Sequence, residues 1–404
     1  YDLPVTYTQI GKGIWGPLSE SPMRVIHPQL LTAFFWRTIL LFPAALLLAG
    51  YLTMSGVRVP LGNLGDDPRR IAGLCLLGSL LVGLTASMVL KFTPVTDDER
   101  IFQFQADLLI DGKLKGDPPP VPGCFDNYFL ITRGKYAGKY NFGNPLFLAA
   151  GKKLGSPYVV PLCFSGALVL LVFLIGRALF PGSPVGMLAA LFLTLSPFFL
   201  FTSATLLSHL PTTVFLALGF WLALKLLQAA AEGRSLPLWG LIAGLAVGYA
   251  WNMRPMTVLG FFSPMAVWLL YRWAWKKEPL GKALAFMALG FYLCVFGTLW
   301  CNKQVTGDPF LFPFQEYEPG EKIGFTHIPV ANYDHTPLRA AENLLMVVLR
   351  INQFLFGWPV SLIFVLGLLL FRSREPGDKL LWLIPPTFCL AYSFFYSPGV
   401  SDTG

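Results

Sequence analysis

Long apolar runs, separated by short polar segments, occupy most of the chain. A helix needs about 20 mostly apolar residues to cross the hydrocarbon core of a bilayer. By that measure the sequence predicts about ten spanning helices, at 33–54, 71–90, 157–179, 184–203, 208–228, 236–252, 256–274, 282–301, 357–371 and 380–397. The runs are too uniformly apolar for a membrane barrel, whose strands alternate apolar and polar residues. The pattern therefore predicts an all-α polytopic membrane protein.

Lys and Arg in the short loops predict the orientation of these helices, because cytoplasmic loops carry the excess of basic residues. The basic short loops alternate onto one side, which we assign as cytoplasmic, and contain Arg69 and Arg70, Arg177, Lys225 and Arg234, residues 272–282, and residues 372–379. The other side then receives two long loops, which usually carry function. The predicted organisation is an extracytoplasmic segment 1–30, transmembrane helices 31–90, a first loop 91–156, a transmembrane bundle 157–301, a second loop 302–356 and C-terminal helices 357–404.

Composition supports a membrane protein and argues against two other classes. Of the 404 residues, 54% are hydrophobic and 13% are charged, whereas soluble domains carry about 25% charged residues. The net charge of +8 fits basic cytoplasmic loops, and no nucleic-acid-binding motif is present, so we expect no nucleic-acid partner. The span interiors are nearly free of charge, unlike those of a carrier. We therefore expect chemistry at the outer membrane–water boundary.

An acidic cluster opens the first long loop. Asp97, Asp98 and Glu99 follow an apolar run directly, and the apolar spacing after them predicts an amphipathic interfacial helix that ends near Asp111. A helix N-terminus favours acids, and Asp97 or Thr96 can cap it. Capping explains one acid better than three consecutive ones beside a bilayer. The three are candidate catalytic carboxylates, and either aspartate could be the base.

Cations on the same side are candidate ligands for an anionic group. Arg254 lies on an outer turn, where a guanidinium can bind such a group in bidentate fashion or extend to the interface from a helix end. Lys139 and Lys303 are weaker candidates of the same kind. His209, near an outer helix end, could touch a substrate or make an interhelical hydrogen bond.

The histidines of the second loop do not indicate a metal centre. His327 and His335 lie eight residues apart in different local contexts, which is a poor ligand pattern for zinc. We predict no metal site and no cofactor, although a divalent metal stays open.

Several stretches resemble the C-type (GT-C) membrane glycosyltransferases, and more closely the bacterial family 39-like branch related to protein O-mannosyltransferases and lipid A aminoarabinose transferases. The matching stretches are VTDDERIFQFQADLLIDGKL, KYNFGNPLFLAAGKKLG, SPFFLFTSATLLSHLPTTVF, GLIAGLAVGYAWNMRP, NKQVTGDPFLFPF, and HTPLRAAENLL with FGWP, and together they cover roughly residues 90–400. The resemblance implies a GT-C-type bundle with two large non-cytoplasmic loops that bear interfacial helices.

The resemblance also implies roles for single residues. Asp98 matches the catalytic aspartate and Glu99 its neighbour, whereas Asp97 is an extra acid. The lysine often seen before the family's Pro-Pro-Leu segment is replaced by KYNFGNP, so a phosphate role falls on Lys139 or another cation. In the same segment, Tyr140 and Asn141 are further candidate substrate-binding residues.

The expected function is transfer of a sugar from a polyprenyl-phosphate donor to a hydroxyl of a lipid, glycan or protein acceptor. A single aspartate base with an in-line donor predicts inversion at the anomeric carbon. The expected location is the bacterial cytoplasmic (inner) membrane, in contact with its lipids, with the site on the periplasmic or extracellular side. Two alternatives stay open: a catalytically inactive GT-C-like scaffold or assembly subunit of a larger complex, and a lipid or sugar carrier.

Overall fold

The computed structural model describes residues 67–118, 120–121, 129–132, 134–318, 323–328, 333–354, 362 and 376–394. The chain forms two compact units. The first comprises Leu61–Pro319 and Ser373–Tyr392, and the second comprises the remaining segments, including Gly320–Arg372. The predicted spans 33–54 and 357–371 lie outside the described residues, apart from Leu362, as does the segment 1–30.

The first unit is a helical bundle with a small hairpin. Its helices are α3 (Pro68–Leu84), continued by the π-helical turn η3 (Thr85–Val89), α4 (Asp97–Ile110), α5 (Gly143–Lys153), α6 (Val159–Leu179), α7 (Val185–Leu195), α8 (Pro197–Ser203), α9 (His209–Ala231), α10 (Pro237–Trp251), α11 (Pro255–Ala274), α12 (Gly281–Thr306), α13 (Pro313–Tyr317) and α16 (Pro376–Ser393). The hairpin strands β1 (Leu130–Ile131) and β2 (Ala137–Gly138) pair antiparallel.

The predicted number of about ten spans is not confirmed. Within the described residues, four helices are long and apolar enough to cross a membrane: α3 with η3, α6, α9 and α12. A fifth span is possible if α7 and α8 count as one, although Ser196 and Pro197 bend them by 62°. Helix α10 is short for a span at 15 residues. Helix α11 contains Pro264, Tyr271 and Arg272, which lower its mean hydropathy.

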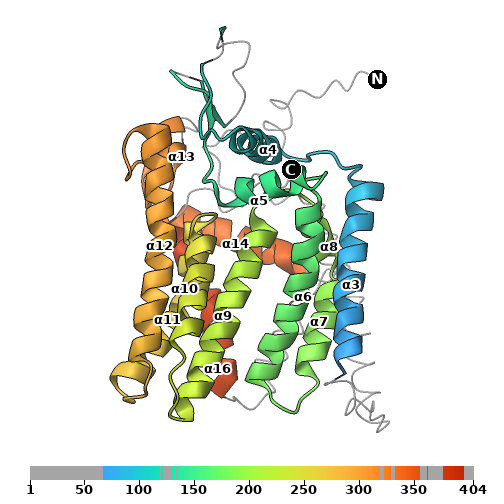
Figure 1. The fold of residues 1–404 in the computed structure, drawn as a ribbon, viewed down its shortest axis with the longest axis vertical. Coiled ribbons are helices and arrows are strands. Elements are labelled where there is room, and N and C mark those ends of the chain that lie inside the picture. Colours follow the sequence, from blue (N-terminus) through green and yellow to red (C-terminus); the bar gives the residue numbers. More distant parts are fainter. Residues whose placement is uncertain are drawn as a thin grey trace. The chain divides into compact units, whose positions relative to one another are not determined.

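The loops between the described helices alternate between the two ends of the bundle, and which end is cytoplasmic stays a prediction. The turns at 180–184, 232–236 and 275–280 lie at one end, and α4, α5, α8 and α13 lie at the other (Figure 1). Helix α4 lies across the bundle at this second end, which we call the outer end. The helix expected to end near Asp111 is present as α4, and α5 is a second short helix at the same end.

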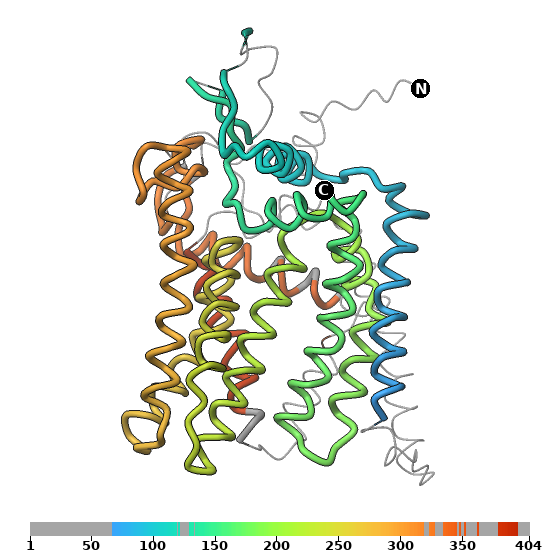
Figure 2. Tube along the Cα trace, viewed as in Figure 1, coloured from blue at the N-terminus to red at the C-terminus, as the bar shows by residue number. Residues whose placement is uncertain are grey.

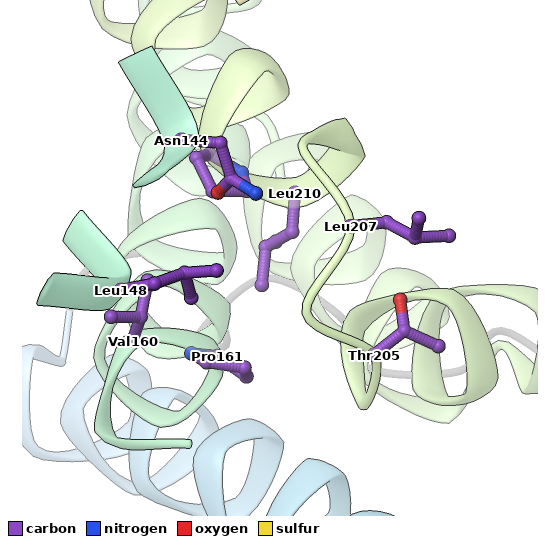
Figure 3. A pocket seen from close by; sticks show the side chains of 8 residues that line it. Asn144, Leu148, Val160, Pro161, Thr205, Leu207 and Leu210 are labelled. Atoms are coloured by element: carbon purple, nitrogen blue, oxygen red, sulfur yellow. The ribbon is translucent and has the colours of Figure 1, made fainter. Parts of the chain in front are cut away.

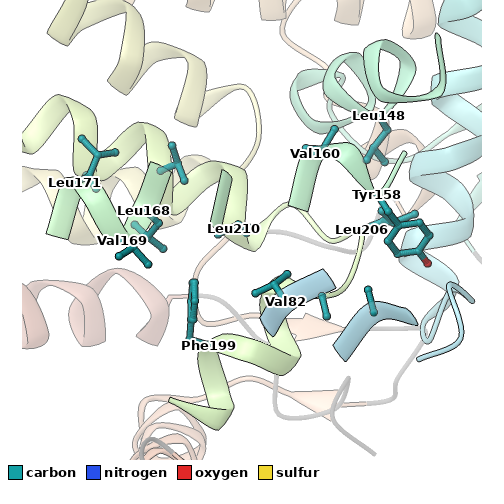
Figure 4. Close-up of a cluster of buried hydrophobic side chains, with 14 of the residues drawn as sticks. Val82, Leu148, Tyr158, Val160, Leu168, Val169, Leu171, Phe199, Leu206 and Leu210 are labelled. Carbon is teal, nitrogen blue, oxygen red and sulfur yellow. The ribbon is translucent and has the colours of Figure 1, made fainter. Parts of the chain in front are cut away.

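Two apolar clusters hold the bundle together, and α9 contributes to both. One cluster joins α3, α5, α6, α8 and α9 through residues such as Val82, Leu148 and Leu210 (Figure 4). The other joins α9, α10, α11, α12 and α16, with Phe220 and Met265 almost fully buried. The trace of α9 accordingly runs between α6 and α10 (Figure 2).

Helices α10 and α12 approach each other at backbone distance. Gly240, Gly244 and Gly248 recur every four residues along α10 and face α12. A Cβ atom at Gly244 would lie 1.9 Å from the carbonyl oxygen of Met287, and one at Gly240 would lie 2.1 Å from that of Ala283. Small residues at such spacing allow helices to pack closely in membranes, where van der Waals contact replaces the hydrophobic effect.

The second unit contains β3 (His327–Ile328), β4 (Tyr333–Asp334) and α14 (Pro337–Phe354). The two strands pair antiparallel, and His327 Nδ1 lies 2.7 Å from Asp334 Oδ1. His335 is buried, with Nε2 2.9 Å from the carbonyl oxygen of Ser393. The two histidines of the second loop therefore have separate local partners.

Candidate functional site

Helix α4 begins with the acidic cluster. Thr96 is the N-cap, and Glu99 reaches back to it in a capping box, so the helix starts at Asp97 as the sequence suggests. Three acids in the first turn suit the positive end of the helix dipole. Asp97 lies 3.7 Å from Arg100, whose side chain is largely exposed. This pair is at the surface, where such contacts contribute little stability.

Asp98 is half-buried and receives a hydrogen bond from the Tyr140 hydroxyl to its Oδ1. Tyr140 is itself fixed in place. Its carbonyl oxygen accepts a 2.6 Å hydrogen bond from the buried Gln105 side chain, and its ring packs on Phe102 at 4.7 Å between centroids. Because Gln105 and Phe102 belong to α4, the helix that carries Asp98 also orients its partner.

Lys139 lies beside this pair in an aromatic enclosure. Its Nζ is 3.7 Å from the ring centroid of Phe129, 5.3 Å from that of Tyr140 and 5.4 Å from that of Tyr317. Rings attract a cation within about 6 Å of their centroid. The backbone of Lys139 donates to the Phe129 carbonyl at 3.0 Å, which closes the base of the hairpin. The three rings come from different segments: Phe129 directly precedes β1, Tyr140 lies between β2 and α5, and Tyr317 ends α13.

Lys135 anchors the tip of the same hairpin. Its ammonium donates to the carbonyl oxygen of Val305 and, at 2.7 Å, to Glu316. The Lys135 side chain is 13% exposed and that of Glu316 27%, so this ion pair is more shielded than the pair of Asp97. It joins the hairpin to α12 and α13.

Glu99 differs from its neighbours because it is fully buried, at 0% exposure. Its Oε1 accepts the backbone N–H groups of Val95 at 2.9 Å and Thr96 at 3.2 Å. Its Oε2 accepts the N–H of Leu206 at 2.8 Å. The turn between α8 and α9 is therefore attached to the N-terminus of α4 through one carboxylate.

Asn144, in the first turn of α5, holds the same turn from another direction. Its Nδ2 donates to the carbonyl oxygen of Leu206 at 2.9 Å, whereas its Oδ1 is buried and has no hydrogen-bond partner. Asn144 lines a small pocket with Thr205, Leu207 and Leu210 (Figure 3), and with Leu148, Val160, Pro161 and Pro211. The pocket has the room that roughly one water molecule needs.

Arg254, the N-cap of α11, lies on the outer turn next to these elements. Its Nη1 is 3.4 Å from Ser208 Oγ, and its charge acts on the neighbouring His209. Helix α5 packs against this turn without room for a side chain, since a Cβ at Gly143 would lie 2.8 Å from the Asn252 carbonyl oxygen. Among the residues that the structure describes, Arg254 has no carboxylate partner.

Tyr158, the residue before α6, lies near Glu99. Burial and the nearby Glu99 carboxylate raise the pKa of Tyr158 to about 12. Its hydroxyl is buried without a hydrogen-bond partner, and its ring meets Phe92 edge to face at 4.9 Å. Both effects disfavour the phenolate, so Tyr158 stays neutral at ordinary pH.

The structure brings some of the candidates together and leaves others apart. Asp98, Tyr140 and Lys139 form one group, and Arg254 and His209 form another. Lys303 is exposed on α12 and, in the described part of the chain, bonds to neither group. Asn141 is half-buried, with an unpartnered Oδ1.

Sequence reasoning did not identify four of the participants: Phe129, Tyr317, Asn144 and the Leu206 peptide group. Asn144 could have been found, because it stands three residues after Asn141 in the same KYNFGNP segment. The Leu206 backbone carries no side-chain signal. Within the described residues, no group of three or more His, Cys, Asp and Glu lies close enough to hold a metal ion.

Part of the chain matches the model of a known protein family. Comparisons with curated proteins and with solved structures give no match. A family model does match, and it covers Arg254 and His209 but begins after Asp98, Lys139 and Tyr140. Residues 145–300, which run from α5 into α12, match the dolichyl-phosphate-mannose-protein mannosyltransferase family, and over this part of the chain the match confirms the resemblance to membrane glycosyltransferases.

Proposed function

We propose that the chain transfers a sugar from a polyprenyl-phosphate donor to an acceptor hydroxyl at the outer, non-cytoplasmic side of the membrane, with Asp98 as general base. In this step the acceptor proton passes to Asp98, and the acceptor oxygen bonds to the anomeric carbon. The bond from that carbon to the phosphate oxygen breaks, and polyprenyl phosphate leaves with the electron pair. Attack opposite the leaving group inverts the anomeric centre.

The observation that carries the proposal is the placement of Asp98 on α4 at the outer end of a bundle whose residues 145–300 match a mannosyltransferase family. Asp98 is half-buried, and one of its oxygens is held by the Tyr140 hydroxyl. A base held in a fixed direction at the mouth of a bundle can take a proton from an oriented hydroxyl. Asp97 points instead to Arg100, which favours Asp98 over Asp97.

Two cationic groups at the outer end are suited to the phosphate of the donor. Arg254 is half-buried and reaches Ser208 with one nitrogen, so the guanidinium has further donors to offer. Lys139 adds a positive charge beside Tyr140. Stabilisation of a leaving phosphate by preorganised cations is a large contribution in phosphate-releasing reactions. The exposed apolar faces of α3 and α12 fit contact with lipid.

The test is transfer from polyprenyl-phosphate mannose that carries a tritium label in the sugar. The wild-type chain and Asp98→Asn are reconstituted in nanodiscs with membrane extract as a source of acceptors, and incorporation of the labelled sugar into the acceptor is measured. We expect Asp98→Asn to lower the rate by about 100-fold or more, because a general base contributes roughly 10²–10⁴-fold. Asp111→Asn, at the exposed C-cap of the same helix, is the matched control and should keep full activity.

Each alternative predicts a different outcome. Equal rates for wild type and Asp98→Asn would remove Asp98 from the mechanism. No transfer by the wild type with mannose, glucose or aminoarabinose donors would favour an inactive scaffold. Movement of labelled donor across sealed vesicles without transfer would favour a carrier.

A further inference from the structure

The peptide group of Leu206 is held from both sides by buried side chains of the outer layer. Glu99 of α4 accepts its N–H at 2.8 Å, and Asn144 of α5 donates to its carbonyl oxygen at 2.9 Å. Glu99, Asn144 and Leu206 are each at most 1% exposed. A backbone turn far away in sequence is thereby attached to two different helices through a single residue.

Neither carboxylate oxygen of Glu99 is available to take a proton from the hydroxyl of an acceptor substrate. One oxygen closes the capping box with Val95 and Thr96, and the other binds Leu206. An ionised carboxylate is costly to bury unless hydrogen bonds compensate it. Charge-assisted bonds from backbone N–H groups are among the strong ones, and the helix N-terminus adds its dipole. Glu99 therefore has the environment of an anchor and lacks the access that a base requires.

The turn that Glu99 anchors leads to the candidate phosphate ligand. Two residues after Leu206, the buried Ser208 contacts the Arg254 guanidinium at 3.4 Å. On the other side, Glu99 directly follows Asp98 in the first turn of α4. The path from Asp98 to Arg254 thus runs through Glu99, Leu206 and Ser208.

We propose that Glu99 is a positioning residue which, through the Leu206 peptide, sets the placement of Ser208 and Arg254 relative to Asp98. The expected effect of Glu99 on the transfer rate rests on the proposed function, whereas its expected effect on the turn at Leu206 does not. Glu99→Gln keeps the size of the side chain but replaces one acceptor oxygen with an NH₂ group. Either the Leu206 N–H or the Val95 and Thr96 N–H groups then face a donor.

The structural part is tested by hydrogen exchange on the full chain in detergent, read on a peptide that covers residues 201–210. We expect Glu99→Gln to speed exchange in this peptide by about tenfold or more, because a hydrogen bond to a charged acceptor is lost. Asp98→Asn is the matched control, and its exchange in this peptide should equal that of the wild type. Unchanged exchange in Glu99→Gln would overturn the proposal whether or not any donor is transferred.

The functional part is tested by the pH dependence of transfer. A carboxylate base gives a rate that falls at acidic pH, and Asp98→Asn should remove this acidic limb. Glu99→Gln should keep the limb while kcat/KM falls by about 100-fold, since a misplacement of about 1 Å can cost that much. Loss of the limb in Glu99→Gln, with its retention in Asp98→Asn, would make Glu99 the base and overturn the proposal.

Asn144→Leu is a second and independent disruption of the same peptide group. It removes the donor to the Leu206 carbonyl oxygen and also the unpartnered Oδ1, while it keeps the number and branching of the side-chain heavy atoms. Exchange at residues 201–210 should again rise, and the acidic limb should persist. If Glu99→Gln does not fold, Glu99→Asp decides the matter, because it keeps the carboxylate but is one methylene too short to reach the Leu206 N–H. Wild-type exchange at residues 201–210 in Glu99→Asp would then refute the anchor.

Discussion

Gly244→Ala adds one methyl group where α10 meets α12, and the structure leaves no space for it. The new Cβ would lie 1.9 Å from the oxygen, 2.7 Å from the carbon and 2.9 Å from the Cα of Met287. All three are backbone atoms of a helix, so no side-chain rotation can relieve the clash. Ordinary contact begins at 3.4 Å, and α12 would therefore have to move by about 1.5 Å.

Such a movement affects a whole row of contacts. A Cβ atom added at Gly240 or Gly290 would also lie within 2.4 Å of the opposing backbone. A shift of α12 at Gly244 therefore opens the interface at both of these glycines. Most of the remaining surface of α12 is exposed, so packing against other helices cannot compensate. Overpacking a close interface costs typically about 1–3 kcal/mol, and a clash with backbone belongs at the upper end. For a chain of 404 residues, at about 2.1 cal/mol/K of unfolding entropy per residue, about 3 kcal/mol corresponds to a Tm lowered by roughly 3–4 °C.

The assay is thermal unfolding of purified protein in one detergent, followed by cysteine reactivity and by circular dichroism. The matched control is Gly297→Ala on α12, where a Cβ meets nothing within 4 Å. This control should be neutral or slightly stabilising, because Ala favours a helix over Gly by about 1 kcal/mol. Equal Tm values for Gly244→Ala and Gly297→Ala would refute the close approach of α10 and α12.

Three further outcomes are expected from the site. Lys139→Met should raise KM for the lipid donor roughly tenfold or more, and Lys139→Arg should restore most of the affinity, because a hydrogen bond to a charged group such as the donor phosphate is worth about 1.5–3 kcal/mol; equal KM values would exclude a role for this charge. Lys135→Met should expose the hairpin to limited proteolysis by leaving Glu316 unpaired, and Lys135→Met with Glu316→Leu should recover part of the protection. Because the folded pKa of Tyr158 is raised to about 12, stability should be intact below the unfolded pKa near 10 and fall as pH rises through 12. Tyr158→Phe should lose less stability over that range in alkaline unfolding curves, and parallel curves would contradict this assignment.

The bundle was predictable where apolar periodicity is long and uninterrupted. The runs at 71–90, 157–179, 208–228 and 282–301 become helices that can span a membrane, with ends shifted by a few residues. The run at 184–203 was predicted as one helix, but Pro197 cannot donate a backbone hydrogen bond and the chain bends there by 62°. Hydropathy alone does not register such a break.

The sequence predicted the acidic residues of the site, but few of the groups that these residues contact. Helical spacing after Asp98 indicated α4, and the aromatic-basic segment before α5 indicated Tyr140 and Lys139. The anchoring of Glu99 depends on the Leu206 peptide, and no residue type marks a backbone N–H as a ligand. Contacts between segments more than one hundred residues apart follow from tertiary packing, which a single sequence does not reveal.

The geometry of α4 assigns the three consecutive acids to different surroundings. Successive helical residues are about 100° apart around the axis, so three in a row cannot share one face. Asp97 faces outward to Arg100, Asp98 faces Tyr140, and Glu99 faces inward to Leu206. An acceptor hydroxyl that approaches from the outer side meets Asp97 or Asp98 but not Glu99, and of these two Asp98 alone is hydrogen-bonded to a tyrosine that α4 itself fixes. Glu99, which a substrate cannot reach, is then the acid whose loss should displace Arg254. We therefore expect Glu99→Gln to impair the placement of the donor phosphate rather than proton transfer.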